Sequence, residues 1–284
     1  MSQSNGFGPE SQAPSGSGKR VVVTGAAGGI GSAAVAELRK RGAQVIGLDL
    51  EPGDDPEIIA CDVRDQDSVD SAIAEATQRL GGLDVLINNA GVGFPQRAGA
   101  RPDASAEAVI DINLMGPWRC TGAAIEALIE SRGRVVNVSS GLAHLAIPLA
   151  PAYCAAKSGL VAYSNALRHE HGDVITVTTV YPGYIRTPIH ESAAAQGVGL
   201  EGTVPAESVD DAANTLVRAA IGKPARDLAT TRRGTASYAA LRFVPRGVVD
   251  KLTLRSFQRG FADRDDIEEL PLTAPIAGRL RPRS

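Results

Sequence analysis

The sequence predicts an α/β protein, a single domain in which a doubly wound parallel sheet carries helices on both faces. Two observations predict this fold class. Strand and helix segments alternate from about residue 19 onward, which is the pattern of parallel strands joined by helical crossovers. The strands are also continuous apolar runs rather than alternating ones, as expected for strands that are buried on both faces.

The first part of the chain supplies four of the expected strands. A glycine-rich turn follows the first strand, Gly42 ends the first helix, and Asp49 closes the second strand. The expected elements are strands over 20–23, 44–48, 58–61 and 84–87, and helices over 30–41 and 67–80.

The second part continues the alternation with longer helices. We expect helices over 104–131, 152–170 and 206–221, and strands over 133–138, 174–180 and 226–231. Pro117 should kink the first of these helices, because proline removes a backbone donor and clashes with the preceding turn. Residues 187–204 are expected to form a mobile segment with weak helix content, of which about 188–204 would act as a lid over the carboxyl ends of the strands.

The two ends of the chain differ from this core. Residues 1–18 are rich in Ser, Gly, Gln and Pro and lack the apolar segment of a signal peptide, so a flexible tail is expected. The single α/β domain would then cover 19–235. Residues 236–284 are expected to form a C-terminal extension packed on it. That extension should be helical over 236–261, broken at Pro245 and Gly247, and extended or disordered from about 264.

Composition excludes several classes of protein. The net charge is −3 and only 4% of residues are aromatic, so no basic or base-stacking surface for nucleic acid is expected. Cys61, Cys120 and Cys154 are odd in number and widely spaced, which favours reduced thiols in the cytoplasm over a disulfide framework or a metal site. No uninterrupted apolar stretch reaches the length of a membrane span.

A glycine turn is the first candidate binding element. The run Thr24-Gly25-Ala26-Ala27-Gly28-Gly29-Ile30-Gly31 follows a strand and opens a helix. Backbone N–H groups and a helix N-terminus there can face a pyrophosphate, and glycines allow the close approach. Taken alone, the run could also be a plain strand–helix loop. The expected cofactor contacts are Gly25, Ala27, Gly29, Ile30 and Gly31.

Asp49 bears on the choice of cofactor. It closes the second strand, eighteen residues after Gly31. A carboxylate there can accept hydrogen bonds from an adenosine ribose 2′-OH and would repel a 2′-phosphate. Leu50 and Glu51 follow, with no arginine to receive a phosphate. NAD is therefore expected rather than NADP, with an acidic cap on a loop as the structural alternative.

Tyr153 and Lys157 are the first candidate catalytic pair. Residues four apart share one face of a helix. A neighbouring ammonium favours the phenolate and is expected to lower the tyrosine pKa from about 10. Such a tyrosine could act as an acid or base near neutral pH.

Several motifs in order resemble the short-chain dehydrogenases/reductases, a family with a Rossmann fold, from about Lys19 to Thr187. The glycine turn is similar to the family's cofactor turn. Asp62-Val63 resembles its adenine-contact pair, and Asn88-Asn89-Ala90-Gly91 resembles the motif that supports the sheet and lines the cofactor site. The resemblance implies further cofactor contacts at Asp62, Val63, Asn89, Ala90, Gly91, Tyr153, Lys157, Pro182, Gly183, Ile185 and Thr187.

Asn113, Ser140, Tyr153 and Lys157 match the catalytic tetrad of this family position by position. Tyr153 would exchange a proton with the substrate oxygen as hydride moves. Lys157 would bind the nicotinamide ribose, Ser140 would stabilise the substrate oxygen, and Asn113 would hold a water that links Lys157 to solvent. The thirteen-residue spacing to Tyr153 selects Ser140 over Ser139.

The sequence thus predicts hydride transfer between NAD and a secondary alcohol or ketone. The mostly apolar loop over 141–152 favours a hydrophobic, steroid- or lipid-like substrate. Two alternatives remain: an NADP-dependent carbonyl reductase, and a catalytically silent nucleotide-binding regulatory protein. The resemblance also implies a homodimer or homotetramer built on the helices near 104–131 and 152–170.

The C-terminal extension is weakly similar to that of members related to hydroxysteroid dehydrogenases. Leu241, Phe243, Leu252 and Phe257 are candidates for its buried face. Lys251, Arg255 and Arg259 recur at four-residue spacing. They would form either a solvated face or one that lies on an anionic membrane surface.

Overall fold

A parallel sheet forms the centre of the molecule in the computed structural model, which describes residues 15–198, 206–231, 234–235, 240, 243–262 and 264–281. Within these residues the sheet has seven strands in the order β3-β2-β1-β4-β5-β6-β9, and all neighbours are parallel. The strands are β1 (Arg20–Thr24), β2 (Gln44–Asp49), β3 (Ile58–Ala60), β4 (Val85–Asn88), β5 (Arg134–Val138), β6 (Thr176–Tyr181) and β9 (Asp227–Ala229). The predicted fold class is confirmed.

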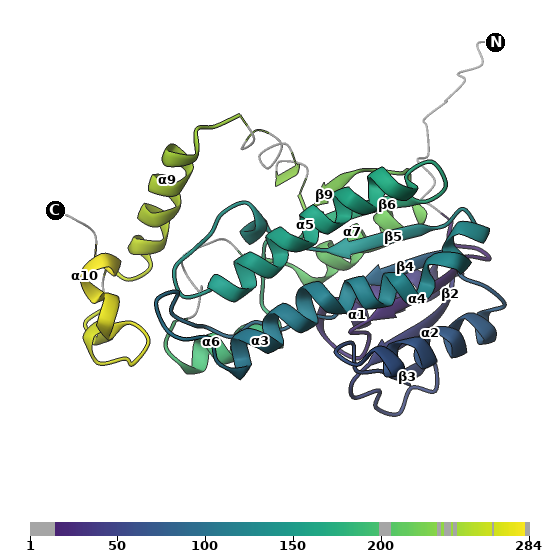
Figure 1. Cartoon of the computed structure of the whole chain (residues 1–284), viewed down its shortest axis with the longest axis horizontal. Coiled ribbons are helices and arrows are strands. Elements are labelled where there is room, and N and C mark those ends of the chain that lie inside the picture. Colours follow the sequence, from purple (N-terminus) through teal and green to yellow (C-terminus); the bar gives the residue numbers. More distant parts are fainter. Residues whose placement is uncertain are drawn as a thin grey trace, which may run out of the picture.

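Helices cover both faces of this sheet (Figure 1). One apolar cluster joins α1 (Gly29–Lys40) and α7 (Val209–Ile221) to the sheet, and a second joins α2 (Gln66–Leu80), α4 (Gly116–Glu130) and α5 (Pro151–His171). Successive residues of β1 alternate between the clusters, since Val21 and Val23 belong to the first and Val22 to the second. All three are fully buried, which explains why the strand is an uninterrupted apolar run.

The strand order reverses between β1 and β4. β1 pairs with β2 on one side and with β4 on the other, so the loops that leave their carboxyl ends diverge. Such a switch point is where open α/β sheets bind ligands. The hydroxyl of Thr24, at the end of β1, accepts hydrogen bonds from the backbone N–H groups of Asn89 and Ala90, both at 3.0 Å. The two loops are thereby tied together at their origin.

The helix predicted over 104–131 is divided in the structure. It consists of α3 (Ala104–Ile110), a π-helical turn (Asp111–Met115) and α4. The expected kink at Pro117 is thus replaced by a wider turn just before it, and Pro117 stands in the first turn of α4, where its missing N–H is tolerated. π-turns inside helices often mark functional sites, and this one contains Asn113.

Short elements follow the central strands. They are η2 (Gly141–Ala143), β7 (Tyr184–Ile185), η3 (Pro188–His190), α6 (Glu191–Ala195) and β8 (Ala206–Glu207), which pairs with β7. The segment expected as a lid contains η3 and α6, while its residues 199–204 lie outside the described residues. Its role as a lid stays a prediction. The helix expected from 206 begins three residues later, where the Ser208 hydroxyl accepts a hydrogen bond from Asp211 N at 3.0 Å.

The C-terminal extension departs most from the sequence prediction. Helix α9 (Arg246–Arg259) begins after Pro245, as expected, but Gly247 lies inside it, so the predicted second break is wrong. The chain from 264 is not extended, because it forms η4 (Asp266–Glu268), η5 (Ala274–Ile276) and α10 (Ala277–Leu280). Ile267 and Leu280 are fully buried. Most residues of this stretch are charged or proline. The apolar residues that pack in its core are few and widely spaced, so no helical or strand pattern is recognisable in the sequence.

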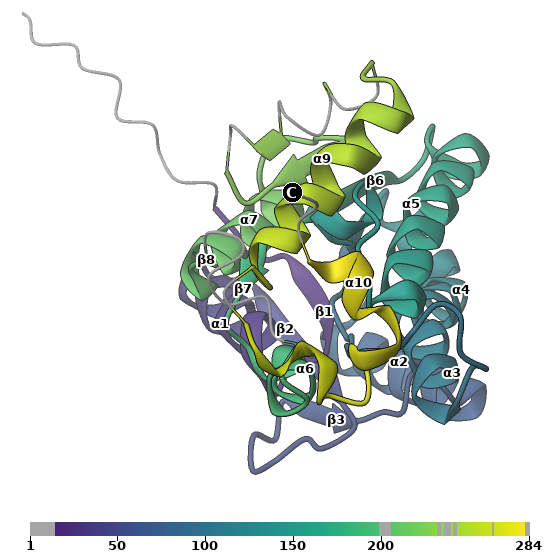
Figure 2. The same ribbon diagram turned by 90° about the vertical axis from the view of Figure 1, so that its left-hand side faces the viewer.

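Helices α9 and α10 lie at one end of the domain (Figure 2), and a third apolar cluster joins the extension to it. Its buried members are Leu149, Val198, Phe257, Phe261, Ile267, Ala277 and Leu280. Of the side chains predicted to be buried, Phe257 is buried, whereas Phe243 and Leu252 are 89% and 58% exposed and were wrongly predicted. Leu241 lies outside the described residues, as does most of the predicted tail over 1–18.

The inward face of α9 is defined by Val249 and Phe257, its two buried residues. They are eight positions apart and so lie on one side of the helix, whereas Leu252 is three positions from Val249 but five from Phe257 and so lies at the edge of this face, where it is 58% exposed. None of the helices in the described part of the chain is both long and apolar enough to cross a membrane.

Candidate active site

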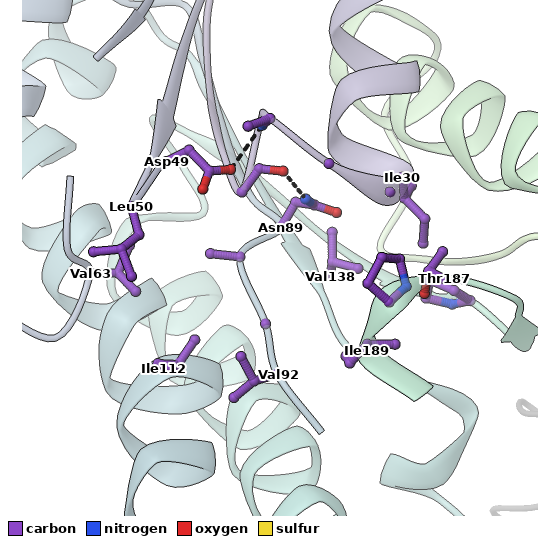
Figure 3. Close-up of a pocket in the computed structure, with 18 of the residues that line it drawn as sticks. Ile30, Asp49, Leu50, Val63, Asn89, Val92, Ile112, Val138, Thr187 and Ile189 are labelled. Atoms are coloured by element: carbon purple, nitrogen blue, oxygen red, sulfur yellow. Dashed lines mark hydrogen bonds between the residues drawn. The ribbon is translucent and has the colours of Figure 1, made fainter. Parts of the chain in front are cut away.

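A cavity of about 640 Å³ opens at the carboxyl ends of the central strands (Figure 3). With one exception, Gly31, the residues predicted to bind the cofactor line it. They are Gly25, Ala27, Gly29, Ile30, Asp49, Asp62, Val63, Asn89, Ala90, Gly91, Tyr153, Lys157, Pro182, Gly183, Ile185 and Thr187. Ser140 lines the same cavity. Residues spread over more than 160 positions of sequence therefore meet at one site.

The glycine turn is shaped by close packing. Gly25 has a φ of +66°, and a Cβ there would lie 2.8 Å from Ala90 Cα. Gly31 lies behind the turn rather than at the cavity, because a Cβ there would collide with the carbonyl oxygen of Gly25. At the start of α1, the N-cap Gly28 offers no side-chain hydrogen bond. The first N–H groups of this helix are thus free of a side-chain cap and can serve an anion.

Asp49 holds the glycine turn and also faces the cavity. Its Oδ2 accepts a hydrogen bond from Ala27 N at 2.8 Å, and its Oδ1 accepts one from Glu51 N at 3.4 Å. The structural alternative, a carboxylate that caps a loop, therefore coexists with a position on the wall of the cavity.

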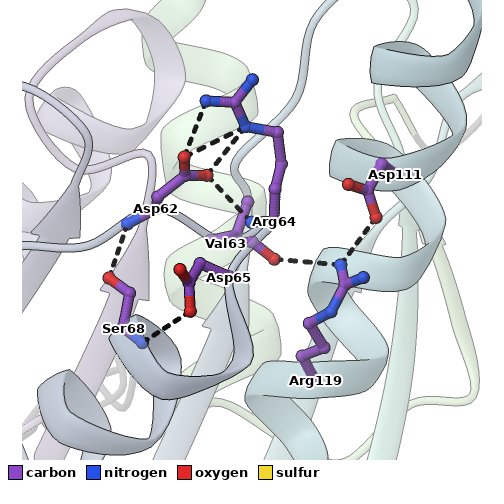
Figure 4. Close-up of polar contacts among 7 residues, drawn as sticks. All are labelled: Asp62, Val63, Arg64, Asp65, Ser68, Asp111 and Arg119. Carbon is purple, nitrogen blue, oxygen red and sulfur yellow. Dashed lines mark hydrogen bonds and ion pairs between the residues drawn. The ribbon is translucent and has the colours of Figure 1, made fainter.

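Asp62 forms an ion pair with Arg64 (Figure 4). Arg64 was not among the residues predicted from the sequence. Arg64 donates from Nε to Oδ1 at 2.9 Å and from Nη2 to Oδ2 at 2.7 Å. This guanidinium holds the pKa of Asp62 below its usual value. On the other side, Arg119 donates to Val63 O at 3.3 Å and pairs with Asp111 at 2.7 Å. Arg64 also lines the cavity. Its position two residues after Asp62 was the one sequence feature that could have identified it as a site residue.

The two asparagines after β4 have different partners. Asn89 Nδ2 donates to the carbonyl oxygens of Thr24 and Gly25, both at 3.1 Å, which fixes the turn. Asn88 faces the interior and donates to Asn137 Oδ1 at 2.8 Å. Asn137 in turn donates to the Ser164 hydroxyl at 2.9 Å. A buried polar chain thus links the sheet beneath the cavity to α5.

Lys157 is the most buried charged group at the cavity. Its side chain is only 3% exposed, and Nζ donates to Val138 O at 2.9 Å. Nζ lies 5.6 Å from the centre of the Tyr153 ring. The Ser139 hydroxyl donates to Lys157 O at 3.0 Å and so holds the backbone. Ser140 is the serine whose hydroxyl interacts with Tyr153, in agreement with the spacing argument.

Burial dominates the protonation of this pair. It raises the pKa of Tyr153 to about 12, against the opposing hydrogen bond with Ser140. It also lowers the pKa of Lys157 to about 8. The expectation that Lys157 lowers the pKa of Tyr153 below 10 is wrong for this arrangement of side chains, because desolvation disfavours the phenolate more than its surroundings favour it. At neutral pH the phenol is protonated.

Asn113 stands behind the cavity rather than on its wall. Its Oδ1 accepts from Val92 N at 2.9 Å, and its Nδ2 donates to Val92 O at 2.8 Å. A Cβ at Gly91 would lie 3.0 Å from Asn113 Oδ1 and 3.6 Å from Lys157 Nζ. Asn113 therefore positions the backbone that passes Lys157. The water that it was expected to hold stays a prediction.

Further residues line the cavity that were not named among the predicted site residues. They include Leu50, Val92, Ile112 and Val138, together with Ile189 and His190 of η3, which lie in the segment expected as a lid. His190 is half-buried, its ring lies 4.8 Å from that of Tyr184, and burial lowers its pKa. Apart from His190, these residues are apolar side chains without a motif, so their positions were not readable from the sequence.

A parallel sheet with a glycine turn at its switch point, and with Ser, Tyr and Lys at one cavity, defines a nucleotide-binding oxidoreductase. The family model of the short chain dehydrogenases matches residues 19–197. The chain belongs to the short-chain dehydrogenase/reductase family, as its motifs predicted.

Two curated relatives illustrate the similarity. Oxidoreductase UcpA of Salmonella typhimurium is 34% identical over 230 residues, which cover 75% of this chain and 82% of the relative. The 11-beta-hydroxysteroid dehydrogenase-like 6 of Arabidopsis thaliana is 36% identical over 183 residues, or 59% of this chain and 54% of that protein.

Solved structures show the same fold. Aldohexose dehydrogenase of Thermoplasma acidophilum matches with a TM-score of 0.67 and 26% identity, over 77% of this chain and 94% of that one. A short chain dehydrogenase from Burkholderia cenocepacia, in complex with NADP, matches with a TM-score of 0.72 and 24% identity, over 84% and 99% of the two chains.

The contact between Gly91, Asn113 and Lys157 gives a testable prediction. Gly91→Ala should lower kcat at least tenfold, because the added methyl would press on Asn113 Oδ1 at 3.0 Å and displace the backbone beside Lys157. Gly99→Ala is the control, since a Cβ there meets nothing within 4 Å. Steady-state kinetics and thermal unfolding of both variants test it, and equal activity of the two would contradict the positioning role.

Proposed function

We propose that this oxidoreductase transfers a hydride between NAD and a secondary alcohol or ketone with a hydrophobic body. The observation that carries the proposal is the meeting of Ser140, Tyr153 and Lys157 on the wall of the cavity that the predicted cofactor contacts line. A second, apolar cavity adjoins Tyr153, which supports the hydrophobic substrate.

The residues of the first cavity fit a dinucleotide. Gly25 has no room for a side chain, since a Cβ there would lie 2.8 Å from Ala90 Cα. The start of α1 has no side-chain cap, so its N–H groups are available to a pyrophosphate. Asp49 suits the adenosine ribose, and the segment from Pro182 to Thr187 suits the nicotinamide end. When bound, the nicotinamide would accept or supply the hydride.

The side chains of this chain would handle the proton. Tyr153 would donate its hydroxyl proton to the carbonyl oxygen in reduction, or receive the alcohol proton in oxidation. Ser140, next to Tyr153, would donate a hydrogen bond to the same oxygen as charge develops on it. Lys157, held by Val138 O, would present its remaining ammonium protons to the cofactor ribose and to the phenol.

Charge on the adenosine side supports NAD over NADP. Asp49 and Glu51 both line this part of the cavity, and each would oppose a 2′-phosphate. Arg64 is the counter-argument, since a guanidinium there could receive a phosphate. Its Nε and Nη2 donate to the two oxygens of Asp62, so this carboxylate offsets part of its charge. The NADP-dependent carbonyl reductase remains the second candidate because of Arg64.

A silent, nucleotide-binding regulatory protein is the alternative from another class. All four residues of the tetrad are present in the sequence, and no observation on this site favours the loss of turnover. Hydride transfer with any member of a panel of secondary alcohols would exclude this alternative.

Tyr153→Phe should remove nearly all turnover while cofactor binding changes by no more than a few fold. Phenylalanine keeps the ring but has no proton to transfer, and general acid–base groups contribute about 10²–10⁴ in rate. Kinetics with an alcohol and a ketone, together with cofactor titration by fluorescence, measure both quantities. Retention of more than about a tenth of the activity would exclude Tyr153 as the acid or base.

The pH profile of the wild-type protein is an independent check on the same residue. Because the pKa of Tyr153 is raised to about 12, the protonated phenol is the dominant form at neutral pH. Ketone reduction should therefore be nearly flat from pH 6 to 8, whereas alcohol oxidation should increase with pH over the same range. An oxidation rate that does not increase would speak against a raised pKa at the proton acceptor.

Cofactor choice tests the charge argument. NAD should give a higher kcat/KM than NADP, and Asp49→Ala should narrow the gap, because it removes both a partner of the ribose and a charge that repels phosphate. Asp54→Ala is the matched control, a nearby exposed carboxylate that does not line the cavity. A wild-type preference for NADP would overturn the assignment and point to Arg64 as its receptor.

We also propose that the chain forms a homodimer or homotetramer through α4 and α5, and that it works in the cytoplasm, where its three free thiols would stay reduced. Trp118 on α4 is 54% exposed although its ring stacks on Tyr163 of α5 at 4.9 Å. Large exposed aromatic residues are typical of interfaces.

Because Trp118 is the only tryptophan, its emission can report on the assembly. Its emission maximum should shift to the red on dilution of the wild-type protein, and Trp118→Asp should sediment as a smaller species. A wild-type monomer at micromolar concentration in analytical ultracentrifugation would exclude this interface.

A further inference from the structure

A second cavity, of about 70 Å³, adjoins the catalytic one. The two share Tyr153, Ile189 and His190, so the second begins where a substrate carbonyl would meet the Tyr153 hydroxyl. Its other side chains are apolar, among them Phe94, Leu142, Ile147, Leu149, Ala193 and Val198. His190 is neutral near pH 7, since burial lowers its pKa. The wall therefore presents no formal charge to a substrate.

Two residues of this wall, Val198 and Phe257, lie beyond the residues that the family model matches. The family match ends at residue 197, whereas Phe257 lies on α9 of the C-terminal extension and lines the cavity. Its side chain is 6% exposed. The extension thus contributes directly to the space next to the catalytic tyrosine.

The position of Phe257 is fixed by packing within the extension. Its ring lies 5.1 Å from that of Phe261, centre to centre. Both belong to the cluster that contains Leu149 of the cavity wall and the fully buried Ile267 and Leu280 of the last turns. The last turns therefore pack behind Phe257 and hold it against the domain.

We propose, on the basis of the proposed function, that Phe257 closes the apolar end of the substrate pocket and limits the length of the group that a substrate carries beside its reacting carbon. The substrate class is a secondary alcohol or methyl ketone with one unbranched apolar substituent. Polyhydroxylated substrates such as free sugars are disfavoured, because their hydroxyl groups would be buried here without partners. The extension is then a specificity element rather than a passive cover.

The test compares two phenylalanines of the extension in the full-length protein. Phe257→Ala should raise the ratio of kcat/KM for decan-2-ol to that for butan-2-ol at least tenfold, because the truncated side chain leaves room for the longer group. Phe243→Ala is the matched control, since Phe243 is 89% exposed, and it should leave the ratio unchanged. Phe257→Leu, which keeps an apolar contact, should give an intermediate ratio and covers the case in which the alanine variant fails to fold.

Binding separates this inference from the proposed function. Calorimetric titration of decan-2-ol into the Tyr153→Phe and Tyr153→Phe/Phe257→Ala proteins should show tighter binding to the double variant. If the wild type turns over no alcohol but Phe257→Ala still changes this affinity, the proposed function fails and the pocket assignment stands. The inference would be overturned if the ratio of kcat/KM for decan-2-ol to that for butan-2-ol were the same in the wild type and both Phe257 variants. It would also be overturned if the wild type preferred L-fucose or an aldohexose to all alkanols.

Discussion

The site depends on the close approach of two backbone segments, the turn after β1 and the strand end after β4. There is no room for a side chain at Gly25, where a Cβ would lie 2.8 Å from Ala90 Cα. Thr24 and Asn89 join the segments by hydrogen bonds of 3.0 to 3.1 Å. The same segment continues through Gly91, which passes between Asn113 and Lys157. The positions of the glycine turn and of Lys157 are therefore set by one piece of backbone.

Burial has opposite effects on the pKa values of Tyr153 and Lys157. Desolvation raises the pKa of Tyr153 to about 12 and lowers that of Lys157 to about 8, since in each case it disfavours the charged form. The ammonium is kept in this environment by a hydrogen bond to Val138 O. A buried charge of this kind costs stability unless it is well paired. The arrangement therefore favours the neutral phenol of Tyr153 beside a lysine whose Nζ is held by one backbone oxygen.

Much of this molecule could be predicted from the sequence, because the signals were local. Continuous apolar runs mark strands buried on both faces, and the glycine turn, Asn88–Gly91 and the Tyr–Lys pair are short motifs. What could not be predicted depends on contacts between distant residues. The sign of the pKa shift at Tyr153 requires knowledge of burial, and the inward face of α9 is set by Val249 and Phe257 packing on a cluster that includes Leu149. The π-turn around Asn113 likewise leaves no pattern in the sequence that distinguishes it from helix.

The proposed chemistry and the apolar wall of the substrate pocket come from different parts of the chain. The first lies within the residues that the family model matches, and part of the second lies beyond them. The residues proposed for the chemistry lie at the ends of β1, β4 and β5 and on α5, all within the residues that match the family model. The apolar wall near Tyr153 is completed by α9, outside that match. Because Phe257 meets the domain through side chains rather than through the sheet, it can change without disturbing the backbone that holds Lys157. A chain built in this way can change its substrate while its hydride-transfer machinery stays the same, which is consistent with a fold that hosts many specificities.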